Sequence, residues 1–376
     1  MLTEVRGAEE KMATPLRILL IGLVLVLSGL GCQPSSDSSD PVEEGKTDSD
    51  KHLNPSTPTQ VNQADIHNEE PKSAEELVMA PAFEDQAEQR GIEFVYDTGA
   101  FGQRLMTEAT GGGVGWLDYN LDGALDLFFV QGGNPQQEIP HPEGDQLYRQ
   151  VEGGQFQKIT QHFLNPDQAH SQCVSVGDYD NDGYLDLFVS NVGRNQLLHN
   201  LGDGTFEDVT ESSGLGETDL WSTTAVWVDL DLDGDLDLYV CNYTNYDARN
   251  PVICRHPDGS PASCDPLVLD AVDNECYENL GDGRFRSVAE EWGLIAPDGK
   301  SLGVVAADFD RDGNLDLYVA NDVTPNHLFQ ADAAGHYQEQ AVLLGAAASE
   351  LGQYQASMGI AVGDYDRNGF LDLYVT

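Results

Sequence analysis

Basic side chains are scarce in this 376-residue chain. Lys and Arg total 18 against 65 Asp and Glu, so the formal net charge is -47 at pH 7. Because a surface this acidic repels phosphate groups, we exclude nucleic acid as a partner. The same repulsion within one chain opposes a compact state unless cations bind, so bound cations are expected.

The chain also lacks an apolar run long enough for a typical transmembrane helix. Residues 18–31 form a run of 14 residues, whereas a spanning helix needs roughly 17–25. Arg17 precedes the run and small residues end it before Cys32, which predicts a secretory signal peptide over residues 1–32. The end of the run is similar to a bacterial lipobox, so Cys32 is the predicted lipidation site. An ordinary signal peptide with an incidental cysteine is the alternative.

Residues 33–80 lack apolar periodicity and are rich in Ser, Asp, Pro, Thr and Gln. Such a segment buries too little apolar surface to offset its ordering entropy, which predicts a disordered, low-complexity tether. The predicted folded part is then residues 81–376. After secretion, a lipid on Cys32 would attach this part to a membrane of the bacterial cell envelope.

Motifs of common enzyme classes are missing as well. The sequence contains no nucleophile elbow, HExxH motif or P-loop. The histidines are scattered, and each is interpreted as structural or exposed: His170, His199, His256, His327 and His336. We therefore predict that the chain is not an enzyme and has no catalytic residues.

What the chain does have is one pattern that recurs five times. Its consensus is D-x-[DN]-x-[DN]-G-x-x-D, and its first Asp recurs at intervals of 60, 51, 79 and 56 residues. Intervals of this length match one propeller blade of four strands better than a short solenoid coil. Strand-like segments such as LDLFV and LDLYV follow each copy.

Hairpin signals accompany the first four copies. The clearest are NLGDGTF at 200–206 and NLGDGRF at 279–285, where Asp-Gly separates apolar residues. An aromatic residue also precedes each loop: Phe83, Phe156, Phe206, Phe285 and Tyr337. Each repeat thus predicts about four short strands, and the fold class is all-β, a β-propeller with about five blades present.

The recurring Asp-rich loops are predicted calcium sites. Side chains at positions 1, 3 and 5 turn toward one centre, Gly at position 6 permits the turn, and a carbonyl near position 7 and the Asp at position 9 complete an oxygen shell. About five Ca²⁺ ions are expected. The predicted ligands are Asp118, Asn120, Asp122 and Asp126; Asp178, Asp180, Asp182 and Asp186; Asp229, Asp231, Asp233 and Asp237; Asp308, Asp310, Asp312 and Asp316; and Asp364, Asp366, Asn368 and Asp372.

Acidic loops of this composition have two other interpretations. An EF-hand needs a Glu at position 12, but this position is Phe129, Val189, Val240, Val319 and Val375, so an EF-hand is excluded. Acidic turns without metal are the second interpretation, since Asp, Asn and Gly favour turns. Crowded carboxylates would then repel one another by about 1 kcal/mol or more per contact, which favours bound metal.

The repeats resemble FG-GAP/VCBS repeats, as in the head propeller of integrin α-subunits. They resemble more closely the cartilage acidic protein-like and ASPIC/UnbV-type proteins. The resemblance covers about residues 83–376 and is carried by GGGVGWLDYNLDGALDL (111–127), NLGDGTFEDVT (200–210) and ANDVTPNHLF (320–329). It implies an extracellular or cell-surface protein, and often adhesion or ligand binding. Such propellers usually have seven blades, so we expect a truncated sequence; completion by a partner chain is the alternative.

Four of the six cysteines lie in a Cys-rich insertion at residues 241–276 that lengthens the third interval. In a secreted chain, clustered cysteines predict disulfides, and we expect Cys254–Cys264 and Cys241–Cys276. A zinc site that includes His256 is the alternative. Cys173 is expected to be a free, buried thiol on a strand.

These observations predict a calcium-stabilised extracellular binding or adhesion module that is anchored to the cell surface. Its expected partner is an unidentified extracellular protein or glycan. It is also expected to contact a membrane through the N-terminal lipid anchor. Two alternatives stay open. One is the propeller scaffold of a secreted polysaccharide lyase or hydrolase whose catalytic part is missing, and the other is a purely structural envelope protein.

Overall fold

A computed structural model describes residues 83–137, 140–160, 169–216, 218–332 and 334–376. The predicted signal peptide, the lipidation site Cys32 and the tether over residues 33–80 lie outside the described residues. Within the described ranges, no helix is both long and apolar enough to cross a membrane.

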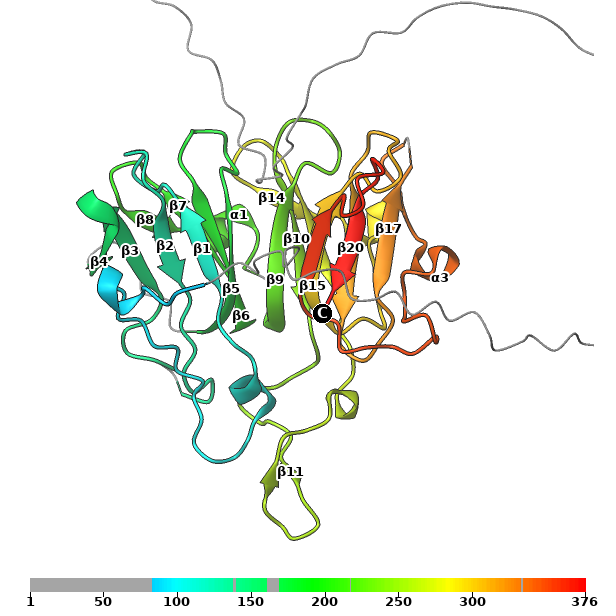
Figure 1. Cartoon of the computed structure of the whole chain (residues 1–376), viewed down its shortest axis with the longest axis horizontal. Coiled ribbons are helices and arrows are strands. Elements are labelled where there is room, and N and C mark those ends of the chain that lie inside the picture. The colour runs from blue at the N-terminus through cyan, green and yellow to red at the C-terminus, as the bar shows by residue number, and fades with distance from the viewer. Residues whose placement is uncertain (1–82, 138–139, 161–168, 217, 333) are drawn as a thin grey trace, which may run out of the picture. The chain divides into compact units, whose positions relative to one another are not determined.

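Antiparallel strands form a series of blades along the chain (Figure 1). The first blade contains β1 (Val114–Leu117), β2 (Asp126–Phe129), β3 (Gln146–Val151) and β4 (Gln155–Ile159). The second contains β5 (His170–Gly177), β6 (Asp186–Gly193), β7 (Gln196–Asn200) and β8 (Phe206–Asp208). The third contains β9 (Leu220–Val228), β10 (Asp237–Asn242), β13 (Glu275–Asn279) and β14 (Phe285–Ser287). The fourth contains β15 (Ser301–Ala307), β16 (Asp316–Asn321), β17 (His327–Ala331) and β18 (Tyr337–Glu339), and the fifth described sheet pairs β19 (Ile360–Gly363) with β20 (Asp372–Val375).

The first strands of successive blades lie next to one another, in the order β1, β5, β9, β15 and β19. Blades two and three are also hydrogen-bonded, because the end of β6 pairs with the start of β9 through Val192↔Trp221 and Gly193↔Leu220. The predicted all-β fold of four-stranded blades is confirmed. This fold follows from the repeat in the sequence, because each repeat encodes one sheet. A single sheet has two faces to bury and must stack on its neighbours.

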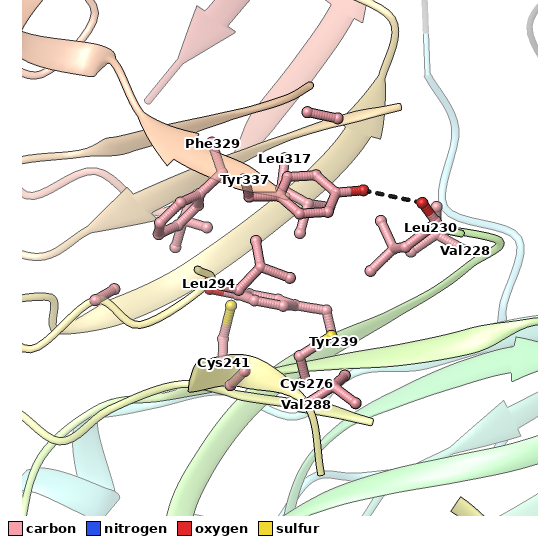
Figure 2. Packing of buried hydrophobic residues seen from close by; sticks show 14 residues of the cluster. Val228, Leu230, Tyr239, Cys241, Cys276, Val288, Leu294, Leu317, Phe329 and Tyr337 are labelled. Carbon is pink, nitrogen blue, oxygen red and sulfur yellow. Dashed lines mark hydrogen bonds between the residues drawn. The ribbon is translucent and has the colours of Figure 1, made fainter. Parts of the chain in front are cut away.

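In the four described four-stranded blades, the second strand is the most deeply buried. All residues of β10 and of β16 are buried, which explains why these segments are near-continuous apolar runs and do not alternate. Figure 2 shows the core between blades three and four, where Tyr239 and Cys276 pack in one cluster with Leu317 and Phe329. Each large apolar side chain buried in this way stabilises the fold by about 1.5–3 kcal/mol.

Short helices connect or flank the blades. They are η2 (Glu88–Arg90), η3 (Met106–Ala109), η4 (Glu152–Gly154), α1 (Thr210–Ser213), η5 (Pro266–Val268), α2 (Ala289–Trp292) and α3 (Ala341–Leu344). After blades two, three and four, a one-turn helix ends at a glycine with positive φ, namely Gly214, Gly293 and Gly345. Left-handed backbone favours glycine, so each of these residues reverses the chain toward the next blade.

The recurring aromatic residue lies in the fourth strand of each four-stranded blade. It is the first residue of β8, β14 and β18, and the second residue of β4. Phe156, Phe206, Phe285 and Tyr337 are buried there. Phe83 differs, because it is 94% exposed and not in a strand. The other four aromatic residues follow a hairpin that pairs their strand, whereas no hairpin sequence precedes Phe83.

The insertion between β10 and β13 contains a small hairpin of β11 (Cys254–Arg255) and β12 (Pro261–Ala262). Cys254 and Cys264 form a disulfide beside this hairpin, as predicted. Because both sulfurs are bonded, neither is available as a thiolate for the zinc site that was the alternative.

The second predicted disulfide, Cys241–Cys276, is wrong. Both thiols are free and buried in the core shown in Figure 2. The register pairs Cys276 with Tyr239, so Cys241 lies two residues further along β10. Diagonal neighbours in a sheet are about 7–8 Å apart, beyond the usual reach of a disulfide. Cys173 is also free and lies on β5, but it is half-buried rather than buried.

Candidate metal centres

The five Asp-rich loops connect the first and second strands of their blades. All five have the same backbone course, with left-handed φ at position 4 and again at the glycine of position 6. The position-4 residues are Leu121, Asn181, Leu232, Arg311 and Arg367, with φ between 55° and 67°. The glycines are Gly123, Gly183, Gly234, Gly313 and Gly369, with φ between 85° and 100°. A non-glycine residue in this region is uncommon, so its fivefold recurrence marks one defined loop structure.

Hydrogen bonds curl each loop around its first Asp. In the third loop, Asp229 accepts from the amides of Asp233 and Gly234, both at 3.1 Å, and Asp231 accepts from the amide of Asp233 at 3.1 Å. The first, second, fourth and fifth loops repeat these bonds. The curled backbone therefore turns the side chains of positions 1 and 3 toward the same side.

Four loops bring three carboxylates together. In each, one oxygen of positions 1, 3 and 9 lies within 4.8 Å of the other two: Asp178, Asp180 and Asp186; Asp229, Asp231 and Asp237; Asp308, Asp310 and Asp316; and Asp364, Asp366 and Asp372. Among the described loops the first is the exception, because Asn120 replaces the carboxylate at position 3. Position 5 lies outside these trios, although Asp182 groups with Asp180 and His199 within the same limit.

The Asp at position 9 opens the second strand and is the most buried of the predicted ligands. Asp126, Asp186, Asp237 and Asp316 are at most 1% exposed. One oxygen of Asp237 accepts from the amide of Asn279 and the other from the amide of Leu230, both at 2.9 Å. These bonds hold the carboxylate at the junction of loop and sheet.

Burial changes the acidity of these groups. It raises the pKa of Asp237 to about 7, and that of Asp126 and of Asp316 to about 6. Burial also raises the pKa of Asp186. In each case, neighbouring loop carboxylates push the pKa in the same direction. A cation placed among these oxygens would reverse both effects, and the all-oxygen donor set fits a hard divalent ion.

Each of the first three loops is also hydrogen-bonded to the next blade. The acceptor is always the carbonyl of position 2, and the donor comes from the end of the third or the start of the fourth strand of the following blade. The bonds are Asn200 Nδ2 to Tyr119 O at 2.9 Å, Asn279 Nδ2 to Tyr179 O at 2.7 Å, and Tyr337 Oη to Leu230 O at 3.2 Å, the last drawn dashed in Figure 2. The loops are therefore part of the contact between blades.

The structure separates the histidines into three groups. His170 and His327 are buried, and Nδ1 of His170 lies 2.7 Å from the carbonyl oxygen of Gly133. His256 and His336 are exposed. His199 is half-buried, and its Nδ1 lies 3.2 Å from Asp186 Oδ1 and 3.4 Å from Asp180 Oδ2. The sequence alone does not predict this contact with the second loop, since the place of His199 beside the loop depends on the pairing of β6 with β7.

Comparison with known proteins gives the family. The model of the FG-GAP-like repeat matches residues 118–189, 178–240, 264–319 and 308–375. The chain belongs to the FG-GAP-like repeat family. Every matched segment ends at position 12 of a loop, and three of the four begin at position 1 of the loop before, so one FG-GAP-like repeat runs from loop to loop. The blades of these repeats form a propeller-like fold.

Curated relatives of this FG-GAP-like repeat chain include cartilage acidic protein 1 of Homo sapiens and of Xenopus tropicalis. Each is 27% identical, and the matches cover 39% and 54% of this chain. The chain spans about 28% of the length of these relatives.

Solved structures show weaker similarity. A rhamnogalacturonan lyase is 12% identical with a TM-score of 0.33, over 71% of this chain and 44% of that one. A lectin of Agrocybe aegerita that recognises non-reducing terminal N-acetylglucosamine is 15% identical with a TM-score of 0.27, over 60% of this chain and 64% of that one. TM-scores this low support no inference about ligand or activity.

Proposed function

We propose that this chain is a calcium-stabilised extracellular binding module and not an enzyme. The observation that carries the proposal is the carboxylate trio of the Asp-rich loops, formed in four loops with the same backbone course. Without a cation, each trio holds like charges close together, and in three of the four trios the position-9 Asp is buried. Hard oxygen donors in a flexible loop suit Ca²⁺ better than Zn²⁺, which prefers nitrogen and sulfur.

Calcium in these loops would act as a structural staple. The ion would join the loop to the second strand through the Asp at position 9. In the first three loops the position-2 carbonyl accepts a hydrogen bond from the next blade, so an ordered loop would also support that contact. Extracellular calcium modules bind at roughly 10⁻⁴–10⁻³ M, which suits permanent occupation outside the cell better than signalling. About five ions would neutralise about 10 of the 47 net negative charges and leave the surface acidic.

Several features support an extracellular location. The Cys254–Cys264 disulfide is of a kind that persists in oxidising compartments. The curated relatives carry the name cartilage acidic protein. Attachment to a bacterial envelope through a lipid on Cys32 stays a prediction, and mass spectrometry of the mature N-terminus would test it.

The disulfide-closed insertion is the proposed contact surface for a partner. It connects the second and third strands of blade three, so it leaves the blades at the end opposite to the Asp-rich loops (Figure 1). Val252, Ile253, Leu267 and Val268 are exposed on it. We propose an extracellular protein or glycan as the partner.

A binding screen tests the proposed function. The purified chain is applied to arrays of glycans and of surface proteins in 2 mM calcium or in EDTA (concentrations of the order typical for extracellular sites). We expect specific binding in calcium that is lost in EDTA and reduced by Asp229→Asn, whereas Asp298→Asn, at an exposed residue outside the loops and the insertion, leaves binding and its calcium dependence intact. Turnover of an arrayed glycan would support the lyase or hydrolase alternative, and no binding in either condition would support a structural envelope protein.

A further inference from the structure

One strand position beside the loops carries a different side chain in each blade. Leu127 of β2 pairs with Tyr148 of β3, so the next residue of β3, Arg149, lies across from the position-9 carboxylate. The same register applies in the next three blades. We name these residues the cross-strand position: Arg149, His199, Glu278 and Gln330. A guanidinium, an imidazole, a carboxylate and an amide thus occupy equivalent places.

Three of the four cross-strand side chains contact the loop carboxylates directly. Arg149 Nη2 donates to Asp122 Oδ2 at 2.7 Å, and Gln330 Nε2 donates to Asp310 Oδ2 at 3.1 Å. His199 Nδ1 lies 3.4 Å from Asp180 Oδ2. The contacted carboxylates belong to loop positions 3 and 5, which are predicted cation ligands. The cross-strand side chain and a bound cation would therefore interact with the same oxygens.

The first and fourth loops differ in the number of their carboxylates and in the charge of their cross-strand residue. The first has three carboxylates, because Asn120 replaces one, and Arg149 adds a positive charge against Asp122. The fourth has four carboxylates, Gln330 is neutral, and the guanidinium of Arg311 at position 4 lies over the ring of Phe370, 5.0 Å from its centroid. Affinity of an oxygen site for Ca²⁺ rises with the number of ligand charges, and a fixed cation a few ångströms away opposes a second one.

We propose that the cross-strand position sets how strongly each loop holds a divalent cation, and that Arg149 is a tethered cation that takes part of the metal's place in the first loop. The first loop then binds calcium most weakly and depends on it least, while the fourth binds it strongly. His199 adds a nitrogen donor beside the second loop. Glu278 adds a carboxylate near the third loop, and an ion pair with Arg286 offsets part of the negative charge of Glu278. This inference rests on the proposed calcium binding.

Exchanging the side chains tests the inference. Calcium uptake by the purified full chain is measured by calorimetry for the wild type, Arg149→Gln and Gln330→Arg. We expect Arg149→Gln to tighten the weakest site about tenfold and Gln330→Arg to weaken one strong site about tenfold, each equivalent to about 1.4 kcal/mol. Arg149→Lys keeps the charge and is expected to leave the weakest site within about twofold of the wild type.

Two controls separate a local effect from net charge and from misfolding. Arg194→Gln changes net charge as Arg149→Gln does, but Arg194 pairs with Glu211 away from the loops. It is expected to shift all sites by less than about twofold at physiological salt. Adding Asp118→Asn to Arg149→Gln should abolish the gain, because the first loop loses a ligand. Circular dichroism is used to check that each variant melts cooperatively.

The outcomes are distinguishable. Equal shifts for Arg149→Gln and Arg194→Gln, or an unchanged affinity in Gln330→Arg, would overturn the role of the cross-strand position while calcium uptake by the wild type upheld the proposed function. No uptake by the wild type would overturn both.

Discussion

The buried Asp at position 9 is subject to opposing electrostatic effects on its charged form. It opens the second strand, accepts backbone hydrogen bonds from both sides, and lies within 4.8 Å of two more carboxylates in the second, third and fourth loops. The backbone bonds stabilise its charged form, while burial and the neighbouring carboxylates oppose it more strongly. The raised pKa is the net result of this competition.

This competition predicts an unusual pH dependence for the metal-free protein. The pKa values of Asp126, Asp237 and Asp316 lie at about 6–7 in the folded chain, above their ordinary value of 3.8. A raised pKa contributes stability that is complete below pH 3.8 and is lost as the pH rises through 6–7. In metal-free buffer, we therefore expect these groups to lower the melting temperature as the pH rises from about 4 to about 7, the interval between their unfolded and folded pKa values.

Excess calcium should reverse this trend, because the ion binds the deprotonated carboxylates. Scanning calorimetry across the same pH range, in metal-free buffer and in calcium, checks both halves of the prediction. A melting temperature that rises with pH in metal-free buffer would contradict the assigned acidity of these residues.

At the scale of the element, the loops and the blade contacts depend on each other. Asn279 ends β13 and is buried, and its amide group bonds the carbonyls of Tyr179 and Leu236 at 2.7 and 3.1 Å. Asn279→Ala leaves both carbonyls without this donor, so we expect a loss of about 2–4 kcal/mol in the free energy of unfolding. Denaturant unfolding in calcium measures it.

Asn250→Ala serves as the matched control, because Asn250 is an exposed residue of the insertion. It should change the free energy of unfolding by less than about 0.5 kcal/mol. The coupling of loops to blades would be refuted if Asn279→Ala were as mild as this control.

The repeating elements could be predicted from the sequence because each is encoded locally. The D-x-[DN]-x-[DN]-G pattern, the apolar run after it and the Asp-Gly hairpin all lie within one repeat, and their spacing gives the blade. The position-9 Asp was also predictable as a candidate ligand, since Gly at position 6 and Asp at position 9 are fixed relative to the first Asp.

Features that depend on pairing between distant strands could not be predicted in this way. Cys241 and Cys276 lie on neighbouring strands as expected for a disulfide, but a register offset of two residues separates them. Arg149 and His199 approach the loops only because β3 and β7 pair in a particular register with the second strands. Repeat spacing contains no information about such offsets.

For the whole molecule, the proposed calcium sites balance an excess of acid that is spread over every described blade. The chain carries a net charge of -47, and its Asp-rich loops recur in the four described four-stranded blades and in the sheet of β19 and β20. Because the first three loops also bond the following blades, a cation in each of them would stabilise both the loop and the stacking of blades. Loss of all cations should therefore destabilise the propeller-like array as a unit.

Calcium-dependent melting of the purified chain tests this claim most directly. With sites of roughly 10⁻⁴ M and millimolar calcium, each occupied loop adds about 1–2 kcal/mol, so we predict a melting temperature at least about 10 °C higher in calcium than in chelator, with calorimetric uptake of several ions per chain. An identical melting temperature in both conditions, together with no measurable uptake, would contradict the account.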